Sequence, residues 1–392
     1  HRVDRRQRQM CIRDSYTLTE RRGDAAQTRV IGAVREVLYA PDQAGAVVTR
    51  LADPACHIAS FTVTEKGYAR SPDGGLDLIA GRSSFYPLLA QGLAERRARG
   101  LGGLTLLPCD NLAENGKVLA RLMEQWLAAD MPDMVEWFRR ECRVPSTMVD
   151  RIVPRTAPQA LTALERHLCM RDAGAVFTEG FSQWVIEDDF AGPRPQWERH
   201  GVQLVNDVAP FETAKLRMLN GAHSLLAYCG LEAGYTYVHQ AVADPRLAAL
   251  AERLMRDEAL PTIPAAPGQD LAAYAGQLMQ RFGDPALMHR LDQIAMDGSQ
   301  KIPQRWLDTA AVLTRRSLPC DAIAAGFAAW VRHLADGRCV DDPHGEELHA
   351  IAITGGARGI ADRCLGAGTG MTALWSGYQH LAQTLLSAER ED

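Results

Sequence analysis

Residues 210–230 read PFETAKLRMLNGAHSLLAYCG, and at this stretch the chain changes character. Pro210 is typical of a first helical turn and Gly230 of a helix end, so we predict a helix between them. Ala- and Leu-rich segments with helical periodicity continue from here toward the C-terminus. The segments that we expect to be helical are 210–229, 246–257, 269–282, 304–316, 319–335 and 371–388. The sequence therefore predicts an all-helical domain over residues 206–392.

The part of the chain before this stretch alternates strand and helix patterns. The predicted elements are a strand or strand pair at 29–40, strands at 57–64 and 104–107, and helices at 85–99 and 116–129. This order is typical of an α/β layer on a parallel sheet, where ligands bind at the loops that follow the strands. Two polar loops, TEKGY at 64–68 and CDN at 109–111, follow predicted strands. We therefore expect ligand contacts at these two loops.

Composition and charge exclude several classes of protein. The chain has 392 residues, of which 46% are hydrophobic and 23% charged, as in a folded protein of two or three domains. Lys and Arg number 43, and Asp and Glu number 48, which gives a net charge of −5. That charge argues against nucleic acid or an anionic membrane as a partner. The sequence also lacks the roughly 18 continuous apolar residues of a membrane span.

Cysteine spacing and the first residues add two expectations. The nine cysteines are spread singly without a C-x-x-C pair, so we predict no metal site and a reducing, cytoplasmic compartment. Residues 1–14 read HRVDRRQRQMCIRD and carry five arginines but no apolar core of a secretory signal. We interpret them as a disordered or non-native tail and leave them out of the functional argument.

The helix predicted at 210–229 carries an unusual set of polar residues. At about 100° per residue, with Lys215 as the origin, Glu212 lies near 60°, His223 near 80° and Asn220 near 140°. One interpretation is a solvated polar face with an ordinary Lys–Glu pair. The other is acid–base chemistry without a metal, in which a desolvated lysine takes a proton from a hydroxyl. The many leucines around these residues argue against a fully exposed helix.

The spacing Lys215, Asn220, His223 resembles the motif of the long-chain, zinc-independent mannitol dehydrogenase family. Further stretches that resemble the family are TVTEKGY (62–68), CDNLAENG (109–116), PSTMVDRIVP (145–154), QWVIEDDFAGPRPQWE (183–198) and QIAMDGSQKIPQRWLD (293–308). The resemblance implies two domains, a Rossmann-like NAD-binding domain over 15–205 and an all-helical substrate and catalytic domain over 206–392. It also implies an NAD-dependent secondary-alcohol dehydrogenase.

The resemblance assigns roles residue by residue. Lys215 would be the general base in oxidation, Asn111 and Asn220 would polarise the reacting oxygen, His223 would contact the substrate, and Glu212 would lie in the proton path. The residues expected close to the substrate are Lys301, Asp150, Glu65 and Gln293, and those expected close to the cofactor are Glu65 and Asn111.

Gln293 stands where mannitol dehydrogenases usually carry arginine, which favours the hexuronate branch of the family, the fructuronate reductases. The implied reaction interconverts D-mannonate and D-fructuronate, with a small-molecule sugar acid or polyol as partner. A polyol 2-dehydrogenase acting on mannitol or arabinitol is the alternative. The sequence does not choose between NAD and NADP and leaves the oligomeric state open, a monomer included.

The family's G-x-G-x-F-H-R loop has no counterpart before Tyr16. That loop holds the dinucleotide pyrophosphate at a helix N-terminus. We therefore expect an N-terminally truncated chain with an incomplete cofactor domain, and a further alternative is an inert fragment that binds the cofactor poorly. The glycine-rich GGARG at 355–359 follows no strand pattern, and we interpret it as a loop rather than a phosphate site.

Overall fold

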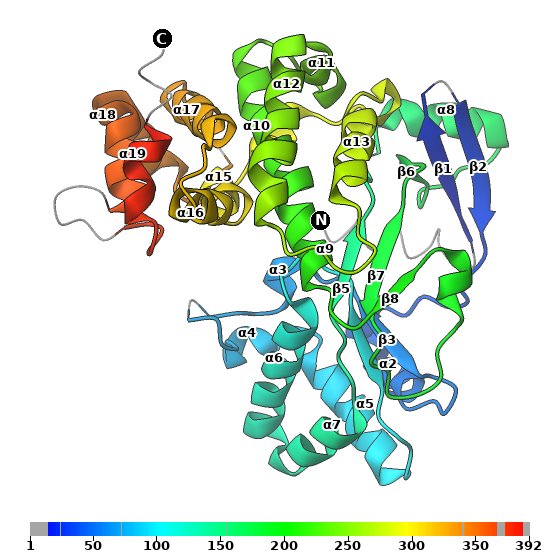
Figure 1. Ribbon diagram of the computed structural model, residues 1–392. Coiled ribbons are helices and arrows are strands. Elements are labelled where there is room, and N and C mark those ends of the chain that lie inside the picture. Colours follow the sequence, from blue (N-terminus) through cyan, green and yellow to red (C-terminus); the bar gives the residue numbers. More distant parts are fainter. Residues whose placement is uncertain are drawn as a thin grey trace. The chain divides into compact units, whose positions relative to one another are not determined.

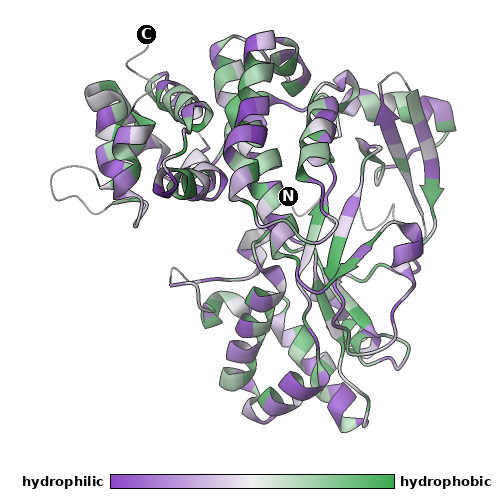
Figure 2. Cartoon of the chain, viewed as in Figure 1, coloured by the Kyte–Doolittle hydropathy of each residue, from purple (hydrophilic) through white to green (hydrophobic). Residues whose placement is uncertain are grey.

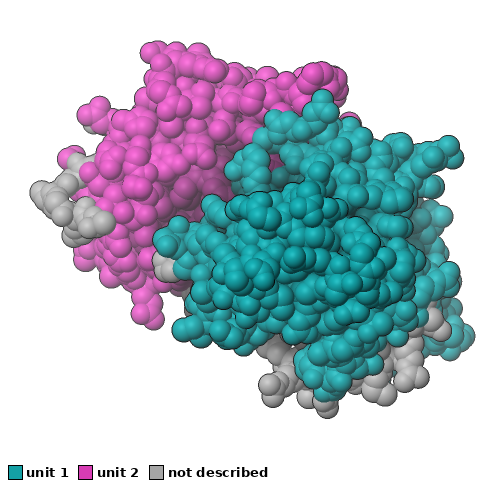
Figure 3. Space-filling model, turned by 90° about the horizontal axis from the view of Figure 1, so that it is seen from below, with its two compact units in different colours: residues 1–209 teal, residues 210–392 magenta. Residues whose placement is uncertain are grey.

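The computed structural model describes residues 15–23, 25–71, 73–154, 156–338, 341–366 and 373–386. The chain forms two compact units, unit 1 from His1 to Ala209 and unit 2 from Pro210 to Asp392 (Figure 3). The tail predicted over residues 1–14 lies outside the described residues.

Unit 1 mixes short strands and helices (Figure 1). Its strands are β1 (Tyr16–Arg22), β2 (Ala25–Ile31), β3 (Ile58–Phe61), β4 (Thr105–Pro108), β5 (Thr147–Asp150), β6 (Val176–Glu179), β7 (Gln183–Glu187) and β8 (Gln203–Val205). Its helices are α2 (Ala40–Leu51), α3 (Thr64–Gly67), α4 (Leu78–Gly81), α5 (Tyr86–Ala98), α6 (Asn115–Asp130), α7 (Val135–Glu141) and α8 (Pro158–Leu168). The predicted α/β layer is confirmed, because β3 and β4 pair in parallel and alternate with α5 and α6.

The packing of α5 and α6 follows from their sequences. In α6 the side chains Leu119, Leu122, Met123 and Trp126 are buried at helical spacing, which forms one apolar stripe. Trp126 stacks on Tyr86 of α5 with ring centroids 5.9 Å apart. All four residues of β4 are buried, as expected for a strand covered on both faces. This core holds the ends of β3 and β4 in place.

Strand β1 forms an antiparallel hairpin with β2 and pairs in parallel with β6. The strand predicted at 29–40 is therefore wrong over most of its length, since the backbone leaves the hairpin after Ile31 and α2 begins at Ala40. Pro41 occupies the first turn of α2, where its missing N–H is not needed. The third sheet has the order β5-β7-β8, with β5 antiparallel to β7.

Unit 2 is helical over its described residues. Its α-helices are α9 (Ala209–Ala214, which starts at the unit boundary), α10 (Gly221–Glu232), α11 (Val238–Ala243), α12 (Pro245–Arg253), α13 (Leu271–Phe282), α14 (Leu291–Ala295), α15 (Gly298–Ile302), α16 (Asp308–Arg315), α17 (Asp321–Ala335), α18 (Gly345–Leu365) and α19 (Ala382–Leu385). Three segments are π-helical: η3 (Lys215–Asn220), η4 (Leu254–Ala259) and η7 (Pro303–Leu307). Every residue of α10 from Gly221 to Gly230 is buried, so this helix is the centre of the core.

Three expectations for unit 2 need correction. The single α-helix predicted at 210–229 is interrupted by the π-helical segment η3. The helix predicted at 371–388 is wrong, because over the described residues 373–386 only the short α19 and a 3₁₀ turn at Gln379–Leu381 form. The loop predicted at 355–359 lies inside α18, where Gly356 adopts a positive φ of 55° and kinks the helix. That conformation suits glycine because it has no Cβ.

Candidate functional site

Lys215 and Asn220 are the first and last residues of the π-helical segment η3. The Gly221 N–H donates a hydrogen bond to the Leu216 carbonyl, five residues earlier, which is the π-helical pattern. Residues five apart therefore lie about one turn apart. In a regular α-helix, Asn220 would lie about 140° around the helix axis from Lys215. The wider π-helical turn brings Asn220 round to the same side as Lys215.

Burial argues against the solvated-face interpretation of the polar set. Glu212, Asn220 and His223 are 9%, 8% and 6% exposed, and Lys215 is half-buried. A solvated polar face would leave these side chains in water. Lys215, Asn220 and His223 instead share one helical stretch that is largely shielded from water. Electrostatic interactions and hydrogen bonds are stronger in such an environment than in water.

His223 lies in a pocket of rings and positive charges. Its ring centroid is 4.6 Å from that of Phe282 and 5.1 Å from that of His289. Burial lowers the pKa of His223 well below 6.5, and positive charge from His289, Arg305 and Arg281 lowers it further. The imidazole is therefore neutral near pH 7. Within the described part of the chain, its Nε2 is buried without a hydrogen-bond partner, which is unusual for a buried polar atom.

In unit 1 the two predicted ligand loops are joined by Asp110, a residue that the sequence analysis did not single out. Its carboxylate accepts hydrogen bonds from the Val63 N–H at 3.2 Å, the Thr64 N–H at 2.8 Å and the Tyr68 hydroxyl at 2.9 Å. The loops after β3 and β4 thus form one connected edge. Asn111 follows Asp110 and is exposed.

Asn115 fixes the other end of the CDN loop and was also missed. Its side-chain amide donates to the carbonyls of Asp110 and Thr147 and accepts the Thr147 N–H at 2.9 Å. Next to it, a Cβ at Gly116 would lie 2.5 Å from backbone atoms of Ser146 and Val144, so only glycine fits. The available signal was the polar segment 109–116 between an apolar strand and an amphipathic helix, which contains both residues.

The remaining predicted residues lie on separate elements. Asp150 ends β5 and is buried, and Gln293 lies on α14 with an exposed side chain. Lys301 lies on α15, where its Nζ donates to the Met296 carbonyl at 2.5 Å. Glu65 lies on α3, and its side chain is outside the described part of the structure. The structure therefore brings Glu212, Lys215, Asn220 and His223 onto one continuous helical stretch, but not the others.

Neither a metal site nor a membrane-spanning helix is present among the described residues. In these ranges no group of three His, Cys, Asp or Glu side chains is arranged to hold a metal ion. The seven described cysteines carry free thiols. None of the described helices combines the length and the apolar character that crossing a bilayer requires.

Comparison with known proteins gives a consistent result for both units. Residues 5–199 match the mannitol dehydrogenase Rossmann domain, and residues 207–358 match the mannitol dehydrogenase C-terminal domain. The chain is 39% identical to D-mannonate oxidoreductase of Escherichia coli over 331 residues, which cover 81% of this chain and 68% of that protein. It is 36% identical to mannitol 2-dehydrogenase of Aspergillus terreus over 364 residues, which cover 87% and 72%.

A solved structure agrees with these sequence relatives. The ternary complex of Pseudomonas fluorescens mannitol 2-dehydrogenase with NAD and D-mannitol superposes with a TM-score of 0.83 at 30% identity. The match covers all of this chain and 82% of that one.

Proposed function

This chain belongs to the mannitol dehydrogenase family, and we propose that it is an NAD-dependent, zinc-independent oxidoreductase that interconverts D-mannonate and D-fructuronate. One observation carries the proposal. The π-helical segment η3 turns Lys215 and Asn220 to the same side of a largely buried helix, beside the neutral imidazole of His223.

The chain's own residues account for the proton chemistry. In oxidation the Lys215 amine takes the proton of the substrate hydroxyl, and Glu212, buried one turn earlier, relays it. The Asn220 amide donates to the oxygen as negative charge develops there. The family resemblance adds Asn111 as a second donor. His223, neutral and unpartnered at Nε2, orients the substrate through a hydroxyl.

NAD, when bound, supplies the hydride acceptor for this reaction. The edge where β3 and β4 end is suited to it, because ligands of parallel α/β sheets bind beyond the carboxyl ends of the strands. Asp110 joins the two loops at that edge, and the neighbouring Asn111 is exposed. Asn111 and Glu65 are the proposed cofactor contacts.

Charge around His223 favours a sugar acid over a neutral polyol. Arg281 and Arg305 act on its imidazole, and such a positive environment attracts a carboxylate. Gln293, at a position where mannitol dehydrogenases usually carry arginine, points to the same branch. Asp150 and Lys301 are the further proposed substrate contacts. A polyol 2-dehydrogenase is the second candidate, because the mannitol 2-dehydrogenase relative has nearly the same identity.

Steady-state rates with D-mannonate, D-mannitol and D-arabinitol, each with NAD and with NADP, test the assignment. We expect kcat/KM for D-mannonate to exceed that for either polyol by at least roughly tenfold, since the positive charges of Arg281 and Arg305 favour a carboxylate over a neutral hydroxyl group. A preference for a polyol would establish the second candidate. An NADH fluorescence titration on the same protein separates a wrong substrate from a failure to bind the cofactor, which would identify the chain as an inert fragment.

We further propose a reducing, cytoplasmic location. The free thiols of the seven described cysteines support it, because exposed thiols such as that of Cys169 persist where disulfides do not form.

A further inference from the structure

The π-helical segment η3 is held by a second π-helical segment, η7. A π-helical turn is rare in proteins and is found frequently at functional sites. Here η3 packs against both η4 and η7, so three π-helical segments lie together in the core of unit 2. The contacts between η3 and η7 include side-chain hydrogen bonds to the backbone.

Two consecutive side chains of η7 donate to two consecutive carbonyls at the end of η3. The Arg305 Nη1 lies 3.4 Å from the Asn220 carbonyl oxygen and 2.7 Å from the Ser224 hydroxyl. The Trp306 Nε1 lies 3.1 Å from the Gly221 carbonyl oxygen. These carbonyls mark the point where η3 ends and α10 begins.

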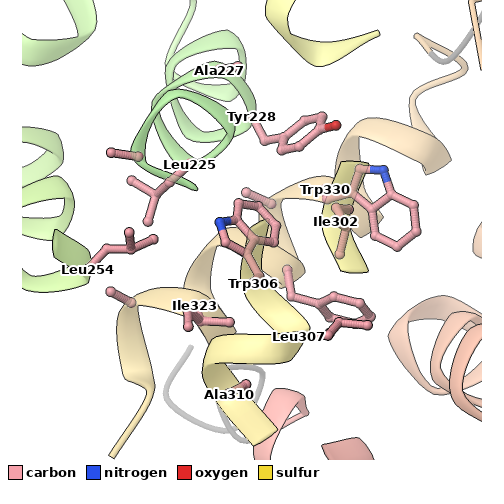
Figure 4. Close-up of a cluster of buried hydrophobic side chains, with 14 of the residues drawn as sticks. Leu225, Ala227, Tyr228, Leu254, Ile302, Trp306, Leu307, Ala310, Ile323 and Trp330 are labelled. Carbon is pink, nitrogen blue, oxygen red and sulfur yellow. The ribbon is translucent and has the colours of Figure 1, made fainter. Parts of the chain in front are cut away.

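Packing makes this contact tight. Trp306 is fully buried, and Figure 4 shows its indole among the apolar side chains of α10, η4 and α17, including Leu225, Leu254 and Ile323. A Cβ built on Gly221 would lie 3.3 Å from the Arg305 carbonyl oxygen, so the two backbones approach closely. The Trp306 ring therefore cannot shift without a rearrangement of the core.

We propose that Arg305 and Trp306 are positioning residues, which hold the η3 turn so that Lys215 and Asn220 face the reacting oxygen together. If the two carbonyls lost these donors, the junction could relax toward a regular helix. In that form Asn220 would turn away from Lys215, and the amide would miss the oxygen it polarises. We call the contacts of Arg305 and Trp306 with the end of η3 the clamp. Its catalytic consequence rests on the proposed function, but the clamp itself is a property of the fold.

Two variants that keep the charge at residue 305 and an aromatic ring at residue 306 test whether these two residues hold the η3 turn. Trp306→Phe removes the indole N–H donor and keeps a smaller buried ring. Arg305→Lys keeps the positive charge but cannot reach both acceptors with a planar fork. The matched control is Arg338→Lys, because Arg338 Nη1 donates to the Leu231 carbonyl at 3.2 Å near the other end of α10.

Two measurements decide the outcome. In Trp306→Phe and Arg305→Lys we expect faster amide hydrogen exchange in the peptide 215–224 and a kcat lower by roughly 10- to 100-fold. KM and NADH affinity should stay within about twofold of the parent, and the Arg338→Lys control should match the parent in both measurements. Unchanged exchange in 215–224, or a loss that falls on KM alone, would overturn the proposal. If the parent itself has no dehydrogenase activity, the proposed function fails, and amide exchange alone still decides the clamp.

Discussion

Lys215 and Asn220 lie one π-helical turn apart, at the two ends of the same six-residue segment. Five residues separate them in sequence, and in a regular α-helix that spacing would direct the two side chains to different sides. The extra residue in the π-helical turn thus places the proposed proton acceptor, Lys215, on the same side of the helix as the proposed hydrogen-bond donor, Asn220.

Replacing Lys215 by alanine should abolish the acid–base step while the protein stays folded. We expect kcat to fall by about 10²- to 10⁴-fold, the usual contribution of a general base. Lys117→Ala is the matched control, since Lys117 is exposed and pairs with Glu114 on the surface of α6. A kcat within a few-fold of the parent at neutral pH would show that Lys215 is not the base.

Asn220→Ala should lower kcat far more than it raises KM. A donor that stabilises developing negative charge contributes about 3 kcal/mol, or roughly 10²- to 10³-fold. Asn111→Ala should behave in the same way if Asn111 donates to the same oxygen. A variant that raises only KM would indicate ground-state binding instead, and steady-state kinetics distinguish the two outcomes.

Asn115→Ala should affect stability in unit 1 rather than chemistry. The Asn115 side chain satisfies two carbonyls and one N–H that are otherwise buried, so its loss should cost about 1–3 kcal/mol in the free energy of unfolding. Asn111→Ala, at an exposed position of the same loop, should change stability by less than about 0.5 kcal/mol. Urea denaturation of both variants checks the contrast, and equal stability losses would contradict it.

The elements predicted correctly from sequence are those whose patterns are strong and local. The helices α5 and α6 carry apolar stripes, and β4 is a continuous apolar run. The hairpin β1–β2 was missed because it is largely hydrophilic, as Figure 2 shows, and β2 is exposed along most of its length. Its partner β6 lies about 150 residues away in sequence, and no local pattern reveals such a pairing.

The candidate site was predicted in composition but not in geometry. Residue types and spacing identified Glu212, Lys215, Asn220 and His223, but a periodicity of 3.6 residues cannot reveal a π-helical turn. That turn depends on contacts from η7, which lies some 80 residues further along the chain. Helix α18 was missed for a related reason, because the glycines around its kink at Gly356 are typical of a loop.

Glu258 makes the stability of unit 2 depend on pH. Its carboxylate, on η4, accepts the N–H groups of Ala322 at 2.7 Å and Ile323 at 2.9 Å, the first-turn donors of α17. Burial raises the pKa of Glu258 from its usual 4.5 to about 7, although the two N–H groups act in the opposite direction. A raised pKa means that the folded state holds a proton that the unfolded state releases.

The folded protein should therefore lose stability from this group as the pH rises from about 4.5 to about 7. Glu258→Gln cannot ionise and should lack this part of the pH dependence. We expect the parent's free energy of unfolding, measured by urea denaturation across that range, to fall relative to that of the variant. Glu252→Gln, which removes an exposed carboxylate on the neighbouring α12, should follow the parent. If the parent instead gains stability over Glu258→Gln as the pH rises, the N–H groups of α17 outweigh burial, and Glu258 is a charged helix cap.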